Sequence, residues 1–298
     1  MKNIFSNLNE LKSFNLPYRE KLDVSKLATF GLELEYQIPY NCIINSNIKK
    51  YPNWNLVNEN TLINGHEIVS PVLKDELTTW NELKEICTLL KNNKADITKG
   101  GGHVHIGSSL LGNNILVWKN FLKLYTIYED ILIYYGFGNF KEPRKSLLFY
   151  AKPIAKNLSY QMKYINKAKN LTELCYTLSY KDKFNALNFS NTMFFDILNA
   201  KDKNTIEFRF PNASDDEYIW QNNVNTFLKM LLKSKSLDSN YLDYLLNYYD
   251  FSKNDNYLYS NVAKALEFCD LIFDNDLDKL YFLKQYFKIS FRGTELRK

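Results

Sequence analysis

The chain contains very little histidine, cysteine, glycine and arginine for its length. Among 298 residues there are three histidines, four cysteines, ten glycines and five arginines. The cysteines, which are far apart in the sequence, are Cys42, Cys87, Cys175 and Cys269. This spacing provides no metal-binding pair, so we expect free thiols in a reducing, cytoplasmic environment.

Long apolar runs and dense blocks of basic residues are also absent. No apolar run reaches the roughly eighteen residues that a transmembrane helix requires, and the first residues show no signal-peptide pattern. The net charge of +5 is mild, so the sequence gives little support for binding to nucleic acid or to a membrane. The composition, with 45% hydrophobic and 24% charged residues, is typical of a globular protein.

The pattern of apolar residues predicts an α+β fold. Alternation or short apolar runs predict strands at residues 29–37, 102–107, 183–190 and 204–210, and a further short strand from residue 66 that Pro71 ends. Helical periodicity predicts helices at about 76–91, 113–135, 215–235, 240–249, 256–273 and 278–287. We therefore expect a largely antiparallel sheet with helices packed on its apolar face.

Three of the predicted strands carry two ionisable residues two positions apart, which places both side chains on one face of the sheet. The pairs are Glu33 and Glu35, His103 and His105, and Glu207 and Arg209. A solvated sheet face also alternates, but it is usually built from mixtures of Lys, Thr, Ser and Glu. Glutamate, histidine and arginine together are instead the residue types that bind metal ions and phosphates.

Carboxylates combined with an imidazole suit Mg²⁺ or Mn²⁺ better than a closed zinc site, which would use thiolates or several imidazoles. Two adjacent cations need at least four or five ligands, and the candidates are Glu33, Glu35, Glu67, His103 and Glu207. Arg209 adds a planar donor for phosphate oxygens. This combination is typical of phosphoryl transfer from ATP.

Other readings of the histidine-containing segment have less support. The segment "GGGHVHIG" lacks the lysine and hydroxyl of a Walker-type phosphate loop, so its glycines, Gly102 included, would allow tight bending or close approach to phosphate. A barrel-type metal hydrolase would need more histidines than His66, which is the one that remains. A serine or cysteine nucleophile would need a distant histidine as its base, and the chain has none.

Four segments in order, "FGLELEYQ", "GHEIVSPVL", "GGGHVHIG" and "NTIEFRF", resemble the motifs of the amidoligase family. That family belongs to the carboxylate–amine ligase superfamily, together with glutamine synthetase and glutamate–cysteine ligase. The resemblance spans about residues 30–222. It implies a glutamine-synthetase-like fold and ATP-dependent formation of an amide or isopeptide bond through an acyl-phosphate, with a carboxylate and an amine (an amino acid or a peptide) as substrates.

The resemblance also implies roles for individual residues. Glu35 and Glu67 would hold one cation, and Glu33, His103 and Glu207 the other. His105 and Gly102 would contact the nucleotide, and Arg209 would stabilise the transferred γ-phosphoryl group. Arg144 would hold a substrate carboxylate or the phosphates.

Residues 1–235 are expected to form the ligase-like catalytic domain, and residues 236–298 a helical extension packed on the same domain. Two alternatives stay open: a phosphotransferase on a related fold, and a catalytically silent binding protein of the same fold. Among single residues, we expect His66 in a turn or at the surface, Glu59 in solvent or at a substrate, and residues 215–217 in the first turn of a helix.

Overall fold

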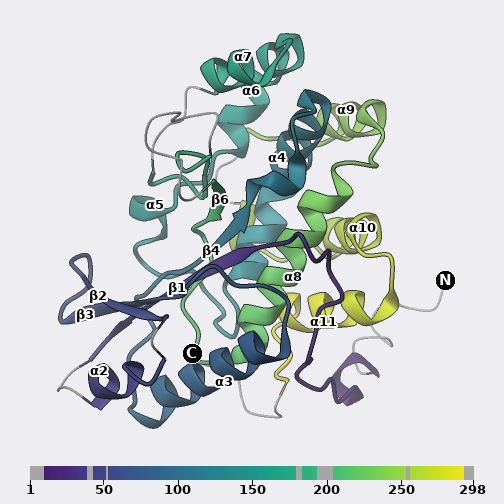
Figure 1. The fold of residues 1–298 in the computed structure, drawn as a ribbon. Helices are drawn as coiled ribbons and strands as arrows, with labels where there is room; N and C mark the ends of the chain where they lie inside the picture. Colours follow the sequence, from purple (N-terminus) through teal and green to yellow (C-terminus); the bar gives the residue numbers. More distant parts are fainter. Residues whose placement is uncertain are drawn as a thin grey trace.

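A six-stranded antiparallel sheet forms the centre of the computed structural model (Figure 1). The structure describes residues 10–38, 43–51, 53–178, 183–192, 204–252 and 256–291. The strands are β1 (Phe30–Gln37), β2 (Asn55–Glu59), β3 (Gly65–Val69), β4 (Gly102–Gly107), β5 (Leu187–Asn188) and β6 (Thr205–Phe208). Their order across the sheet is β2-β3-β1-β4-β6-β5.

Helices surround this sheet, so the α+β prediction is confirmed. The α-helices are α2 (Ile43–Ile48), α3 (Leu77–Asn92), α4 (Ile115–Gly136), α5 (Leu147–Tyr150), α6 (Ala155–Lys167), α7 (Leu171–Thr177), α8 (Glu217–Lys233), α9 (Ser239–Tyr248), α10 (Val262–Ile272) and α11 (Asp276–Tyr286). Two 3₁₀ turns are η1 (Ser108–Leu111) and η3 (Asn256–Leu258). None of the helices in these described ranges has the length and apolar character needed to cross a bilayer.

One face of the sheet packs against α3, α4 and α8. Phe30 of β1 stacks on Trp80 of α3 with ring centroids 5.3 Å apart. Phe208 of β6 stacks on Phe227 of α8 at 4.1 Å and lies 6.5 Å from the ring of Tyr125 in α4. These buried aromatic contacts seal the face that the alternating pattern predicted to be apolar.

Capping residues explain where several helices begin. The side chain of Asp216 accepts a hydrogen bond from the backbone N–H of Tyr218, as predicted for an acidic first turn of α8. The helix predicted at about 256–273 is wrong in its first part, because η3 and α10 are separate. The Asn261 side chain accepts from the N–H of Lys264, which starts α10 as a new helix.

The strand that was predicted to end at Pro71 is β3. β3 ends at Val69, two residues before Pro71, although Leu73 still forms a single bridge with Phe30. Its partner β2 was missed because this strand is polar and largely exposed, without an apolar alternation. The β2–β3 pair projects from the sheet at the left of Figure 1.

The N-terminal segment is held by the last described helix. Arg19 Nη1 lies 2.6 Å from the Asp278 carboxylate in α11, and the Arg19 guanidinium stacks on the ring of Tyr281. The hydroxyl of Tyr281 donates to the carbonyl of Pro17, and Lys284 Nζ donates to the carbonyl of Phe14. The helix α11 also contacts α4, α8 and α10, so it connects this segment to the helices behind the sheet.

The cysteines are buried thiols where the structure describes them. Among the described residues no disulfide joins Cys87, Cys175 and Cys269, which agrees with the expectation of thiols, and Cys42 lies outside those residues. Burial raises the pKa of the Cys269 thiol to about 12, which keeps it protonated at neutral pH.

Candidate functional site

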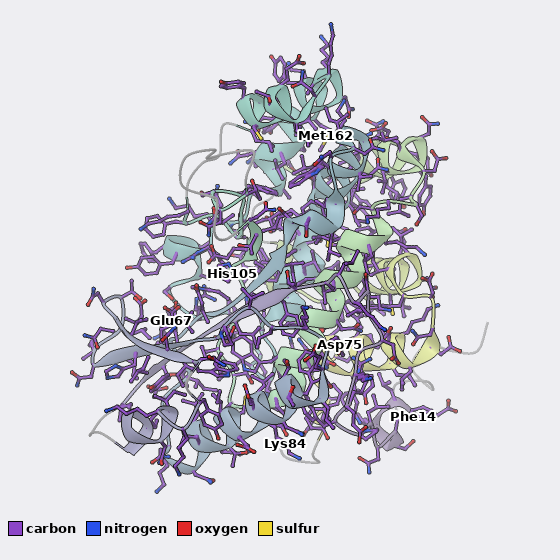
Figure 2. All side chains as sticks on the ribbon, viewed as in Figure 1. Phe14, Glu67, Asp75, Lys84, His105 and Met162 are labelled. Atoms are coloured by element: carbon purple, nitrogen blue, oxygen red, sulfur yellow. The ribbon has the colours of Figure 1, made fainter. Side chains whose placement is uncertain are left out.

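The strand register brings the predicted ligand residues together on the face opposite the helices. Glu33 pairs with His103 across β1 and β4, and Glu35 pairs with Glu67 across β1 and β3. His105 pairs with Glu207 across β4 and β6 in the same way. Figure 2 labels Glu67 and His105, which lie along the sheet away from α9, α10 and α11.

His103 occupies the centre of this cluster and is almost completely buried. Its Nδ1 atom lies 2.9 Å from Glu33 Oε2 and 3.7 Å from Glu207 Oε1. Its Nε2 atom lies 3.4 Å from Glu35 Oε1. The two ring nitrogens therefore face different carboxylates, and His103 stands between two groups of oxygen donors.

Two sets of three residues have donor atoms close enough to surround a metal ion. One set is Glu33, His103 and Glu207, and the other is Glu35, Glu67 and His103. Within each set the donor atoms lie within 4.8 Å of one another. Carboxylate oxygens with one imidazole nitrogen match the preferences of Mg²⁺ and Mn²⁺.

The backbone next to His103 leaves space for a cation. A Cβ atom on Gly101 would lie 2.6 Å from His103 Nε2 and 3.1 Å from Glu35 Oε2. Because glycine has no Cβ, that volume beside two donor atoms is clear. The Gly101 N–H also donates to Glu35 Oε2 at 2.5 Å, which fixes the carboxylate in place.

Electrostatics distinguish the two ends of the cluster. Burial favours a higher pKa for Glu33, but hydrogen bonds and charge from His103 and His105 outweigh it and hold the pKa well below its usual range. Burial, followed by the negative charges of Glu33, Glu35 and Glu59, raises the pKa of Glu67 to about 9. The Glu67 end thus has excess negative charge, which a divalent cation would compensate.

His105 and Glu207 form the other end of the cluster. His105 Nε2 lies 3.0 Å from Glu33 Oε1, and its Nδ1 lies 3.3 Å from the hydroxyl of Thr205. The Asn188 side chain donates to Glu207 Oε2 at 2.7 Å. These contacts orient both side chains over the sheet.

Arg209 follows β6 rather than lying in it. Its Nη1 donates to Glu207 Oε1, and its Nε donates to the carbonyl of Tyr150 at 3.2 Å. Its own N–H donates to the carbonyl of Ala186 at 2.9 Å. The guanidinium therefore lies beside Glu207, within the cluster, as the spacing of the two residues predicted.

Arg144 lies beneath the cluster and is buried. Its Nη1 donates to the carbonyls of Phe210 and Pro211, at 3.1 and 2.6 Å, and its Nη2 donates to the carbonyl of Arg209 at 2.8 Å. Burial lowers the pKa of Arg144 to about 10, with the Glu35 carboxylate opposing and the Arg209 charge adding to the shift. The side chain holds backbone carbonyls in this structure.

Gly102 faces the helices rather than the cluster. A Cβ there would lie 2.6 Å from the carbonyl oxygen of Asn212 and 2.9 Å from Cη2 of Trp220. Its N–H donates to the carbonyl of Pro211 at 2.9 Å. Close packing against Asn212 and Trp220 therefore explains why a residue without a Cβ atom is needed at this position. The predicted contact of Gly102 with the nucleotide stays a prediction.

Two residues discussed from the sequence lie at the edge of the cluster. Glu59 ends β2, and its carboxylate accepts a hydrogen bond from the N–H of Thr61 at 2.7 Å. Its negative charge contributes to the raised pKa of Glu67. His66 is part of β3 rather than a turn, pairs with Tyr36, and its ring lies 5.9 Å from that of Tyr36. It therefore points to the face opposite Glu67.

An open pocket lies beside His105, near the first residues of β1 and the last residue of β3. Its volume is about 180 Å³, and its lining includes the polar Glu33 and His105 together with Gly31, Val69 and Val72. The pocket was not predicted, because its wall comes from the segment after β3, far from β4 in the sequence. It places an apolar cavity directly beside two of the cluster's polar groups.

Comparison with models of known protein families gives a match over most of the chain. Residues 18–231 match the profile of a family described as "Putative amidoligase enzyme". The matched range contains every residue of the cluster. No curated protein matches the chain.

Proposed function

Because the chain belongs to the amidoligase enzyme family, we propose that it uses ATP to join a carboxylate and an amine through an acyl-phosphate, on a glutamine-synthetase-like fold. The observation that carries this proposal is the arrangement around His103: two sets of cation ligands with Arg209 adjoining one of them. Divalent cations bound there would neutralise phosphate charge and polarise the phosphoryl oxygens. Residues 1–235 would form the catalytic part, with 236–298 packed on it.

The two ends of the cluster suit different substrates. His105 and the apolar pocket beside it provide a polar contact for phosphates and an adjacent cavity for the nucleoside. The acidic end, with Glu35 and Glu67, would hold the cation that faces the carboxylate and amine. The polar face would thus order nucleotide and acid along β1.

Arg209 would act on the phosphoryl group during transfer. Its guanidinium would have to shift part of its hydrogen bonding from Glu207 to phosphate oxygens, whose charge spreads during transfer. Lysine keeps the charge but loses the planar fork, so Arg209→Lys is expected to lose about 10²–10³ in kcat with little change in nucleotide Kd. Single-turnover ATP cleavage and a thermal melt on the same sample measure this, and a destabilised but fully active variant would contradict the role.

The products distinguish a ligase from the alternatives. The protein is incubated with ATP, Mg²⁺ and pools of amino acids and amines, and ADP, phosphate and new amides are measured by mass spectrometry. A ligase releases phosphate in amounts that match the new amide and that require both acid and amine. A phosphorylated acceptor without free phosphate would instead show a phosphotransferase, and neither product would show a silent binding protein.

A further inference from the structure

The turn that follows β6 lies against the glycine segment that precedes β4. The N–H of Gly102 donates to the carbonyl of Pro211, and the N–H of Ala213 donates to the carbonyl of Gly100 at 3.0 Å. Gly101 and Asn212 form an isolated antiparallel bridge between these contacts. The two segments therefore hold each other's backbone in position.

Arg144 joins this pair of segments from below. Its guanidinium donates to three successive carbonyls, those of residues 209–211, and its N–H donates to the Asn212 side chain at 2.9 Å. The carbonyl of Pro211 thus accepts from both Arg144 and Gly102. The guanidinium also pairs the carbonyls of Arg209 and Phe210, and an unpaired carbonyl in a buried turn would be costly.

The glycine segment in turn fixes one of the candidate cation ligands. The Gly101 N–H donates to Glu35 Oε2, and the Glu35 N–H donates to the carbonyl of Gly101 at 3.1 Å. The other end of the same turn carries Arg209, whose guanidinium contacts Glu207. Arg144 therefore lies at the junction between the two ends of the cluster.

We propose that Arg144 is a positioning residue, which sets the turn at 209–212 and through it places Glu35 and Arg209, rather than a ligand for a substrate carboxylate or phosphate. Its side chain is 4% exposed, and its donors point to backbone carbonyls. Groups that orient metal ligands from behind typically change metal affinity by about 10–100-fold when they are removed. The inference rests on the proposed cation site.

Cation binding without nucleotide or substrate separates positioning from ligand binding. Mn²⁺ affinity is measured by electron paramagnetic resonance on the full chain, for wild type, Arg144→Lys and Arg144→Met. We expect the affinity to fall about 10–100-fold in Arg144→Met and by less in Arg144→Lys, which can hold one carbonyl but not three. Arg19→Lys is the control, because the Arg19 side chain is also largely shielded from solvent but pairs with Asp278, away from the cluster.

Each result has a defined meaning. Unchanged Mn²⁺ affinity in both Arg144 variants with weaker ATP or acid binding would overturn the inference in favour of a substrate ligand. A loss of melting temperature like that of Arg19→Lys, with Mn²⁺ affinity intact, would overturn it in favour of a merely structural role. If Arg144→Met does not fold, the Arg144→Lys measurement decides. Absence of Mn²⁺ binding in the wild type would instead contradict the proposed function.

Discussion

The two faces of the central sheet come from the same strands, but one face carries apolar side chains and the other carries ionisable ones. On β6, Phe208 points to the helices and stacks on Phe227, whereas its neighbour Glu207 points to the other face and contacts Arg209. The first face is dry and stabilises the fold through buried apolar area. The second face concentrates carboxylates, and burial, followed by the negative charges of its neighbours, raises the pKa of Glu67 there. Because successive residues of a strand point to opposite faces, the residues that stabilise the fold and the residues that form the candidate site alternate along the same strands.

The largest expected effects come from two single substitutions in β6, one on each face of the sheet. Glu207→Gln removes a charged donor from the set Glu33, His103 and Glu207, so we expect at least a hundredfold loss of turnover and weaker Mn²⁺ binding. Its melting temperature should fall less than that of Phe208→Ala, because the amide keeps the size of the side chain although it loses the charge that pairs with Arg209. Activity and thermal melts on the same preparation measure both effects.

Phe208→Ala is the opposite-face partner of that variant. Removing a buried ring is expected to cost about 3–5 kcal/mol of unfolding free energy. Below the melting transition, the surviving folded protein should keep its Mn²⁺ affinity. A Phe208→Ala protein that loses Mn²⁺ binding while still folded would show that the two faces are not independent.

Adjacent glycines offer a second, smaller test. Gly101→Ala puts a methyl group against His103 Nε2 and Glu35, so it is expected to weaken Mn²⁺ binding about tenfold. Gly102→Ala puts the methyl against the Asn212 carbonyl and Trp220, and is expected to cost about 1–3 kcal/mol of stability. Titration with Mn²⁺ and urea unfolding measure the pair, and equal effects of both variants on both quantities would refute the division.

The smallest effect concerns the charge on Glu67 without metal. Below pH 4.5, its ordinary pKa, the carboxyl is protonated in both the folded and the unfolded chain, so it costs no stability. Between pH 4.5 and about 9 the unfolded chain ionises while the folded chain keeps the proton, so stability falls as pH rises. We expect Glu67→Gln in EDTA to melt a few degrees above wild type at pH 8 but close to it at pH 5.

Divalent cations should reverse that order. Mn²⁺ binds the ionised carboxylate, so it is expected to raise the melting temperature of wild type at pH 8 more than that of Glu67→Gln. If the melting temperatures of the two proteins differ by the same amount at pH 5 and pH 8, with or without Mn²⁺, the result would argue against a raised pKa for Glu67.

The sequence predicted the parts of the fold that repeat with a regular period. The strict alternation in β1, β4 and β6 predicted both their existence and the shared face of Glu33, His103 and Glu207, because strand geometry fixes which side chains lie together. It missed β2, whose polar residues at the sheet edge bury little. The sequence analysis also predicted one helix where η3 and α10 are separate. Apolar residues occur on both sides of Asn261, so the periodicity did not reveal that Asn261 begins a new helix.

The contacts that complete the site were beyond sequence reasoning for a different reason. Arg144 and the carbonyls it holds are 65 to 67 residues apart, and Gly101 and Glu35 are 66 apart. No local pattern reports which backbone carbonyl a distant arginine will meet. The family resemblance implied that Arg144 holds a substrate carboxylate or the phosphates, and its contacts with the turn at 209–211 could therefore come only from three-dimensional packing.

The contacts between α11 and the N-terminal segment limit the order in which the chain can fold during synthesis. Arg19 and Asp278 are separated by 259 residues, and Phe14 and Lys284 by 270. A ribosome releases the first partner long before the second exists, so these bonds form only after the last helix has emerged. Until then the first segment has only the partners that are made earlier, such as Asp75 for Leu22 and Gln221 for Arg19, and it lacks the contacts that α11 supplies.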